Sequence, residues 1–115
     1  MAPFQLEARM AKYLLQVSYT TEGSKGVQKE GGTSRRKAAQ ALVESVGGTL
    51  EVLYFAFGDC DVFAIADFPD SVSAAAASLA VATSGAATAK TTVLITPDEM
   101  DQAAKKLPAY RAPGR

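Results

Sequence analysis

A short polar segment, Glu30–Arg36, carries the residue types best suited to binding an anion. It reads EGGTSRR and leads into a predicted helix that begins after Thr33 or Ser34, with Arg35 and Arg36 in its first turn. Free backbone N–H groups at a helix start, with hydroxyls and two arginines nearby, suit a carboxylate or a phosphate. The GxxxxGK[ST] spacing of a P-loop is absent. In the alternative interpretation the segment is a capped helix start, and its arginines pair with one of three acids, Glu51, Asp59 or Asp61.

Acidic, aromatic and basic side chains on the predicted strands and turns supply further candidates. Asp59 and Asp61 flank a predicted turn, and Asp61 is a weak candidate for a general base, although turn formation and ion pairing explain both acids more simply. Tyrosines on strands suit the wall of a cavity, where their hydroxyls would orient a ligand, or else they belong to the core. These tyrosines are Tyr13, Tyr19 and Tyr54. Lys90 and Asp67 are charges inside predicted strands, and they would form a buried pair if they met across a dimer.

Histidine is missing from the sequence, and this limits the chemistry more than any motif does. The commonest general base and the commonest ligand of metals and haem are therefore excluded. A zinc site would need several cysteines, whereas the chain has Cys60 alone. We therefore expect no metal and no cofactor, and any reaction would use Tyr, Asp, Glu, Arg or Lys.

Length and net charge indicate the number of domains and exclude some classes of binding partner. The 115 residues suit one domain, and 12 basic against 12 acidic residues leave no net charge for nucleic acid or an anionic membrane. No stretch approaches the ~20 apolar residues of a membrane span, and a single cysteine favours the cytoplasm. We expect a flexible extension over residues 1–10, one domain over 11–107 and a tail over 108–115.

Hydrophobic periodicity and turn residues then predict the elements that position these side chains. The predicted strands are 12–20, 49–57, 62–68 and 88–95, and the predicted helices are 34–46, 71–83 and 97–107, with a polar connection over 22–33. Two βαβ units joined by a hairpin predict an α+β, ferredoxin-like β-α-β-β-α-β fold with an extra C-terminal helix. Its antiparallel four-stranded sheet carries helices on one face only.

The uncovered face of this sheet predicts self-association. Alternation along the strands leaves one of two sets of large apolar side chains uncovered. The set we expect is Leu14, Leu53, Phe55, Phe63 and Ile65, with the alternate set following if the register shifts by one residue. Small monomers rarely leave such a patch in water. We therefore expect a homodimer through the open sheet face, or a higher oligomer.

Three segments resemble one known family. Residues Tyr19–Gly48, Tyr54–Asp70 and Lys90–Lys106 are similar to GYD-domain proteins, small bacterial proteins of the dimeric α+β barrel superfamily. The glycine, tyrosine and aspartate that name the family would fall in Gly58–Asp61, where Cys60 takes the place of the tyrosine. That superfamily includes cofactor-free oxygenases, lactone isomerases, haem enzymes and ligand-sensing domains. The resemblance therefore implies a fold and a pocket between sheet and helices, but no reaction.

Three hypotheses for function follow. The preferred one is a homo-oligomeric module that binds a small, partly apolar or anionic ligand between sheet and helices. Its candidate binding residues are Tyr19, Arg35, Arg36, Tyr54 and Lys90. The second is a cofactor-independent monooxygenase or isomerase of an aromatic or lactone substrate, which needs a carboxylate such as Asp61 in an apolar cavity. The third is a structural or assembly role, which a cavity filled by phenylalanine and leucine side chains would favour.

Overall fold

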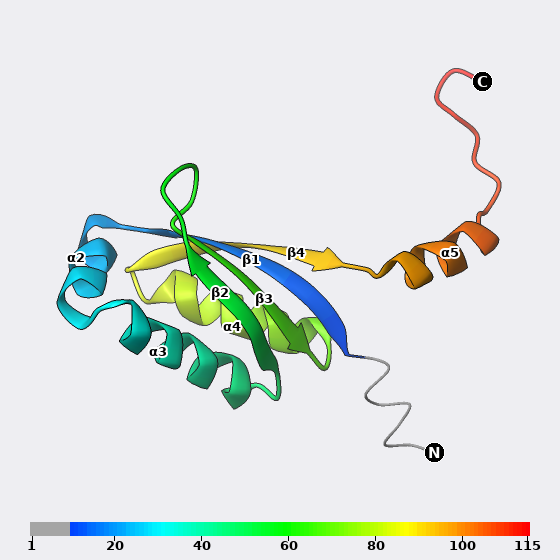
Figure 1. Ribbon diagram of the computed structural model, residues 1–115. Helices are drawn as coiled ribbons and strands as arrows, with labels where there is room; N and C mark the ends of the chain where they lie inside the picture. Colours follow the sequence, from blue (N-terminus) through cyan, green and yellow to red (C-terminus); the bar gives the residue numbers. More distant parts are fainter. Residues whose placement is uncertain (1–9) are drawn as a thin grey trace, which may run out of the picture.

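The computed structural model describes residues 10–115, so the predicted extension over residues 1–10 lies almost entirely outside the described residues. Eight elements follow one another within these described residues (Figure 1). They are β1 (Ala11–Tyr19), α2 (Thr21–Glu30), α3 (Gly32–Ser45), β2 (Thr49–Phe55), β3 (Val62–Phe68), α4 (Ser71–Thr83), β4 (Ala87–Leu94) and α5 (Pro97–Lys105).

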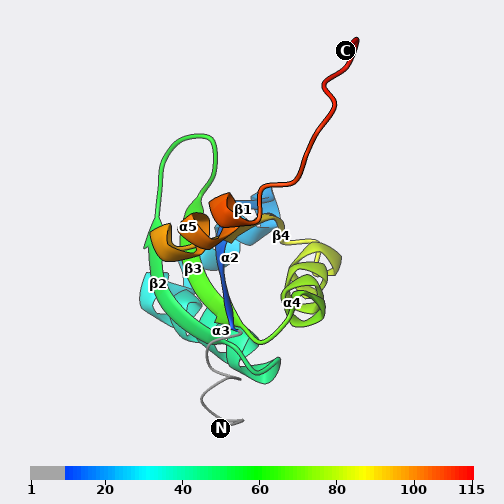
Figure 2. The same ribbon diagram turned by 90° about the vertical axis from the view of Figure 1, so that its right-hand side faces the viewer.

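The four strands form one antiparallel sheet in the order β2-β3-β1-β4. Helices α3 and α4 lie side by side against one face of this sheet, and no other helix in the described part of the chain packs on the opposite, open face (Figures 1 and 2). This arrangement confirms the predicted α+β, ferredoxin-like sheet with helices on one face. In the described part of the chain no helix is both long and apolar enough to cross a membrane.

The segment after β1 corrects the sequence prediction, because it is a helix and not a polar connection. Thr20 caps α2, and its side chain accepts a hydrogen bond from the Gly23 N–H at 3.1 Å. Gly31, with φ of +88°, then separates α2 from α3. Helix α3 begins at Gly32, two or three residues before the start predicted after Thr33 or Ser34, and its N-cap is Gly31, so the predicted caps were wrong. Arg35 is the fourth residue of α3 and lies near the start of the helix, as predicted.

The core lies between the sheet and the helices. Its buried side chains are Tyr13, Val43, Leu50, Ala64, Ala66, Phe68, Ala74 and Ala77. Phe68 is completely buried, and its ring meets the ring of Tyr13 edge to face, with centroids 5.5 Å apart. Alanines at Ala74 and Ala77 let α4 approach the sheet closely, since they present no side chain beyond Cβ.

A β-bulge in β2 changes which side chains face the helices. The pairing of β2 with β3 shifts between Leu50 and Val52, so Glu51 is an extra residue in the strand. An extra residue moves every later side chain to the opposite face. Leu53 and Phe55 therefore face the helices, which corrects their predicted place on the open face. The apolar side chains of the open face include Leu14, Val52, Tyr54, Phe63, Ile65 and Leu94.

Helix α5 stands apart from the rest of the domain, beyond the end of β4 (Figure 1). The predicted helix start is confirmed: Thr96 and Glu99 form a reciprocal capping box, and Pro97 is the first helical residue. The helix ends at Lys105, two residues earlier than predicted. The predicted tail, residues 108–115, has neither helix nor strand.

Candidate functional site

An apolar cavity of about 280 Å³ lies between the sheet and the helices. All four strands contribute to its floor, with side chains such as Leu15, Val17, Leu53, Val62 and Ala89. Leu42 from α3 and Val81 from α4 form its sides. Phe55 belongs to the wall and does not fill the space.

The cavity exists because small residues line the two helices above the sheet. Ala38 and Ala39 of α3 and Ala77 and Ala80 of α4 face it, and an alanine reaches no further than Cβ. Larger side chains at these positions would close the gap between α3 and α4. The alanines of α4 therefore have two effects. They let its buried residues pack closely on the sheet, and they leave the cavity open beside them.

Two of the predicted binding residues line this cavity. Tyr19 enters it from the end of β1, and Arg35 enters it from α3. Among the described residues that line the cavity, Arg35 alone carries a formal charge. Its guanidinium Nη1 lies 3.6 Å from Oε1 of Glu30, and both side chains are partly exposed, Arg35 at 35%. Exposed ion pairs of this kind are weak, so Glu30 can be displaced by another anion.

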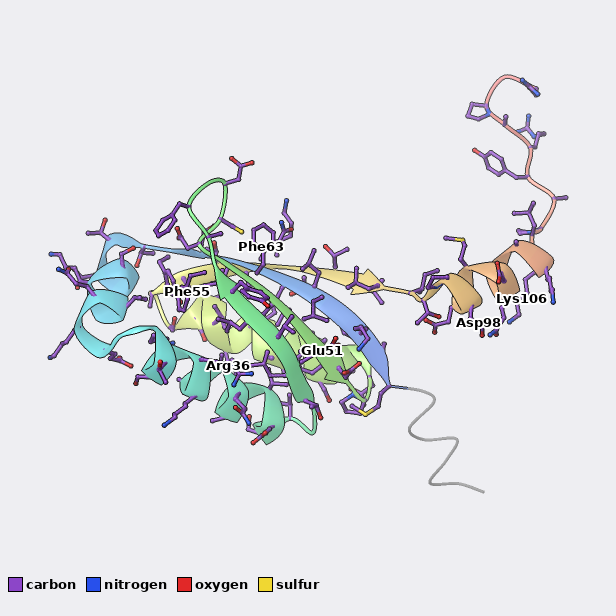
Figure 3. The ribbon with its side chains drawn as sticks, in the orientation of Figure 1. Arg36, Glu51, Phe55, Phe63, Asp98 and Lys106 are labelled. Carbon is purple, nitrogen blue, oxygen red and sulfur yellow. The ribbon has the colours of Figure 1, made fainter. Side chains whose placement is uncertain are left out.

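The other predicted binding residues lie elsewhere. Arg36 is exposed on α3, where it donates a hydrogen bond to Gln40 at 3.2 Å (Figure 3). Tyr54 is 70% exposed on the open face, and Lys90 is exposed on β4 opposite Gln16. The structure thus brings Tyr19 and Arg35 together and separates them from the remaining three candidates.

Asp61, the candidate base, holds the β2–β3 hairpin loop (residues 56–61) against β1. Its Oδ2 accepts a hydrogen bond from the Tyr19 N–H at 2.8 Å, and its own N–H donates to the Val17 carbonyl oxygen at 2.8 Å. Asp61 is not among the described residues that line the cavity. The alternative partners predicted for the arginines are also corrected, since Arg35 pairs with Glu30 and Arg36 with Gln40.

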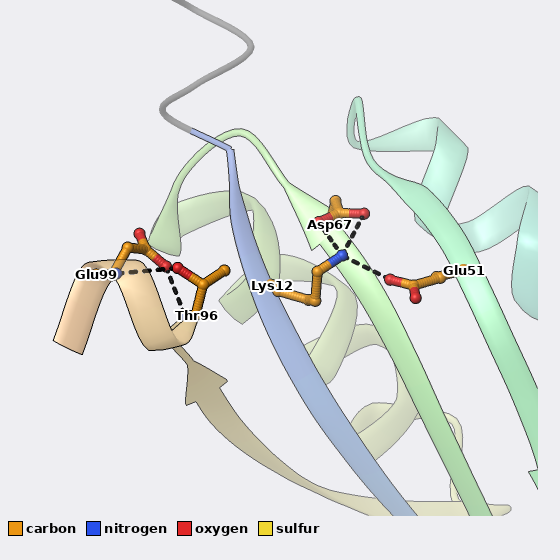
Figure 4. A network of polar contacts seen from close by, with 5 residues as sticks. All are labelled: Lys12, Glu51, Asp67, Thr96 and Glu99. Carbon is orange, nitrogen blue, oxygen red and sulfur yellow. Dashed lines mark hydrogen bonds and ion pairs between the residues drawn. The ribbon is translucent and has the colours of Figure 1, made fainter. Parts of the chain in front are cut away.

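A charge cluster that sequence reasoning missed lies on the open face (Figure 4). The Lys12 ammonium lies 2.5 Å from a carboxylate oxygen of Glu51 and 3.0 Å from one of Asp67. These hydrogen bonds, first to Glu51 and then to Asp67, raise the pKa of Lys12 above its ordinary value. Asp67 therefore pairs with Lys12 within the chain. Strand alternation places Lys12 on the open face, but the bulge that brings Glu51 there is invisible in the sequence.

Cys60 is buried in the hairpin, where its thiol lies 3.5 Å from the Val62 carbonyl oxygen. Over residues 10–115, no three His, Cys, Asp or Glu side chains gather closely enough to hold a metal ion. The chemistry available at the cavity is therefore that of apolar walls with a guanidinium and a phenol.

Comparison with known proteins gives one match. The family model described as GYD domain matches residues 13–104, which span the sheet, α2, α3, α4 and most of α5. Neither the curated proteins nor the solved structures contain a match to the chain.

Proposed function

The chain belongs to the GYD domain family, and we propose that it is a homo-oligomeric binding protein for a small apolar molecule with an anionic end. The observation that carries this proposal is the cavity with apolar walls and Arg35 as its charged residue. The family match itself brings no activity with it, so the proposal depends on the chemistry of the site.

The size and lining of the cavity define the ligand class. About 280 Å³ is near the lower end of the range for ligand pockets, roughly 300–1,000 Å³. Burial of an alkyl or aryl group against leucine, valine and alanine supplies affinity. A carboxylate would displace Glu30 from Arg35 and form a charge-assisted hydrogen bond, and Tyr19 lines the same cavity.

The open face supports the homo-oligomeric part of the proposal. It carries large apolar side chains, of which Tyr54 is 70% exposed and Phe63 is 40% exposed (Figure 3). A second copy stacked on this face by a two-fold axis would cover the same residues on both chains. The Lys12 ammonium is paired with two carboxylates within the chain, and exposed Lys90 adds a positive charge on the same face. We also propose a cytoplasmic location, because an unpaired cysteine is typical of reducing compartments.

The cavity favours binding over the two alternatives. A cofactor-independent monooxygenase or isomerase needs a base, and no carboxylate lies among the described residues of the cavity lining. A purely structural role would leave no reason for an unfilled space of this size between sheet and helices, since protein interiors are otherwise closely packed.

Calorimetry with octanoate and octanol tests the proposal, since these probes share a chain and differ in charge. The wild-type protein is expected to bind octanoate about tenfold more tightly than octanol, because one charge-assisted hydrogen bond contributes roughly 1.5 kcal/mol or more. Arg35→Gln is expected to remove this preference and to leave octanol binding unchanged.

Arg36→Gln is the matched control, since Arg36 is the next residue on the same helix but lies outside the cavity lining. It should keep the full preference for octanoate. Equal binding of both probes by wild type, or equal losses in the two variants, would show that Arg35 does not select an anion.

A further inference from the structure

Helix α5 is a short helix without packing partners among residues 10–115. No residue from Pro97 to Lys105 is buried, and both views show the helix standing clear of the sheet and the other helices (Figures 1 and 2). Isolated helices shorter than about 12–15 residues are marginal in water, and protein helices gain most of their stability from packing an apolar face. A nine-residue helix such as α5 therefore needs a surface to pack on.

The helix presents an apolar stripe suited to that purpose. Met100, Ala103 and Ala104 follow the spacing i, i+3 and i+4, which places them on one side of α5, and Leu107 follows two residues after the helix ends at Lys105. Met100 is 56% exposed and Leu107 is 81% exposed. Gln102 lies on the opposite side and donates a hydrogen bond to Asp98.

A second exposed apolar group lies at the other end of the sheet. Phe57, in the β2–β3 hairpin loop, is fully exposed. The strand register places this loop beside Val17, near the end of β1, whereas β4 leads into α5 beside Lys12, near the start of β1. The loop and α5 therefore flank the sheet at opposite ends of its strands.

The hairpin loop and α5 also lie on the same side of the sheet as its open face. Figure 1 shows the hairpin loop projecting away from α3 and α4, and α5 lying beyond the end of β4, higher in the view than the nearby ends of β1, β2 and β3. Figure 2, seen from that end, shows α5 in front of the strands, between β4 and β2 in the view. A second sheet stacked on the open face would lie between the loop and α5.

We propose that the apolar stripe of α5, together with Leu107 just after the helix, packs against Phe57 of a second copy of the chain. This inference rests on the proposed dimer through the open face. A two-fold axis perpendicular to the strands exchanges their two ends, so the α5 of each chain meets the hairpin loop of the other and the contact forms twice. Charges of opposite sign flank the two sides of this contact. Exposed Asp59 lies in the loop, and exposed Lys105 and Lys106 lie beside Leu107.

A double-mutant cycle on the dimer dissociation constant tests this contact, with sedimentation equilibrium of the full-length chain as the measurement. Phe57→Ala and Leu107→Ala should each weaken the dimer about tenfold. The double variant should be little weaker than either single variant, since both remove the same contact. Gln102→Ala, on the opposite side of α5, is the control and should leave the constant unchanged.

The outcomes separate this inference from the proposed function. A wild-type dimer whose constant is unchanged by Phe57→Ala and Leu107→Ala would overturn the α5 contact and leave the dimer standing. Losses that add fully in the double variant would show that the two residues do not touch, and would also overturn it. A wild-type monomer would overturn the contact and the homo-oligomer together, whereas octanoate binding would still be tested by calorimetry.

Discussion

At the scale of single residues, two cations have different tasks. Arg35 faces the cavity, and its partner Glu30 is held only by a partly exposed pair, so the guanidinium remains available to a ligand. Lys12 instead joins three strands, since it lies on β1 and its two acids lie on β2 and β3. We assign ligand recognition to Arg35 and sheet cohesion to Lys12.

The Lys12 cluster predicts a particular pH dependence of stability. The pKa of Lys12 is raised in the folded chain, so its contribution is fully present below the unfolded value of about 10.4 and is lost as the pH rises through the folded value. Wild type should therefore exceed Lys12→Met in free energy of unfolding at neutral pH, by less than about 1 kcal/mol because the pair is partly exposed. This difference should shrink above about pH 10.

Urea unfolding of both proteins across the alkaline range measures this difference. A difference that stays constant from neutral to strongly alkaline pH would show that the charge of Lys12 is not what stabilises the sheet.

Only some of the residues that line the cavity could be predicted from the sequence. Tyr19 and Arg35 were recognisable because a tyrosine on a strand suits a cavity wall and an arginine near a helix start suits an anion, and both line the cavity. Arg36 has the same residue type and is one position later, but about 100° of helical rotation turns it to solvent. The bulge places Tyr54 on the open face and not on the helix-covered face that simple alternation predicts. No residue pattern in the sequence predicts this bulge.

At the scale of elements, α2 shows why local propensity was misleading. Gly23 and Gly26 lower the helix propensity of this segment, and the sequence therefore favoured a loop. In the structure, α2 packs against the chain entering β4, and a Cβ at Gly23 would collide with the carbonyl oxygen of Ala86. Gly23 is required by a contact with a residue far away in the sequence. A local sequence pattern cannot predict such a contact.

The two glycines of α2 predict opposite effects of the same substitution. Gly26→Ala should stabilise the protein by about 0.5–1 kcal/mol, because nothing lies within 4 Å of the added Cβ and alanine favours helix. Gly23→Ala should destabilise it by about 1–3 kcal/mol, because the backbone of Ala86 has to move.

Thermal and urea denaturation of the two variants provide the measurement, and each variant serves as the control for the other. If both substitutions stabilised the protein, the close approach of α2 to Ala86 would be refuted.

At the scale of the whole molecule, the sequence predicted the fold well because its main signals were local. Strand alternation, the Gly47–Gly48 helix stop and the Thr96–Pro97 helix start place most elements within a few residues. The cavity was less predictable, since its volume depends on how far apart α3 and α4 lie over the sheet. That distance is a property of the packed structure, and no single segment of the chain specifies it.

The central claim is that the cavity between sheet and helices binds a small apolar anion. Titration of the full-length, ¹⁵N-labelled protein with octanoate, followed by NMR, tests it most directly. The account predicts that the largest amide shifts occur at residues lining the cavity, such as Val17, Ala77 and Ala89, and that Leu14 and Ile65 on the open face change little. Shifts that are absent, or that are largest on the open face, would contradict it.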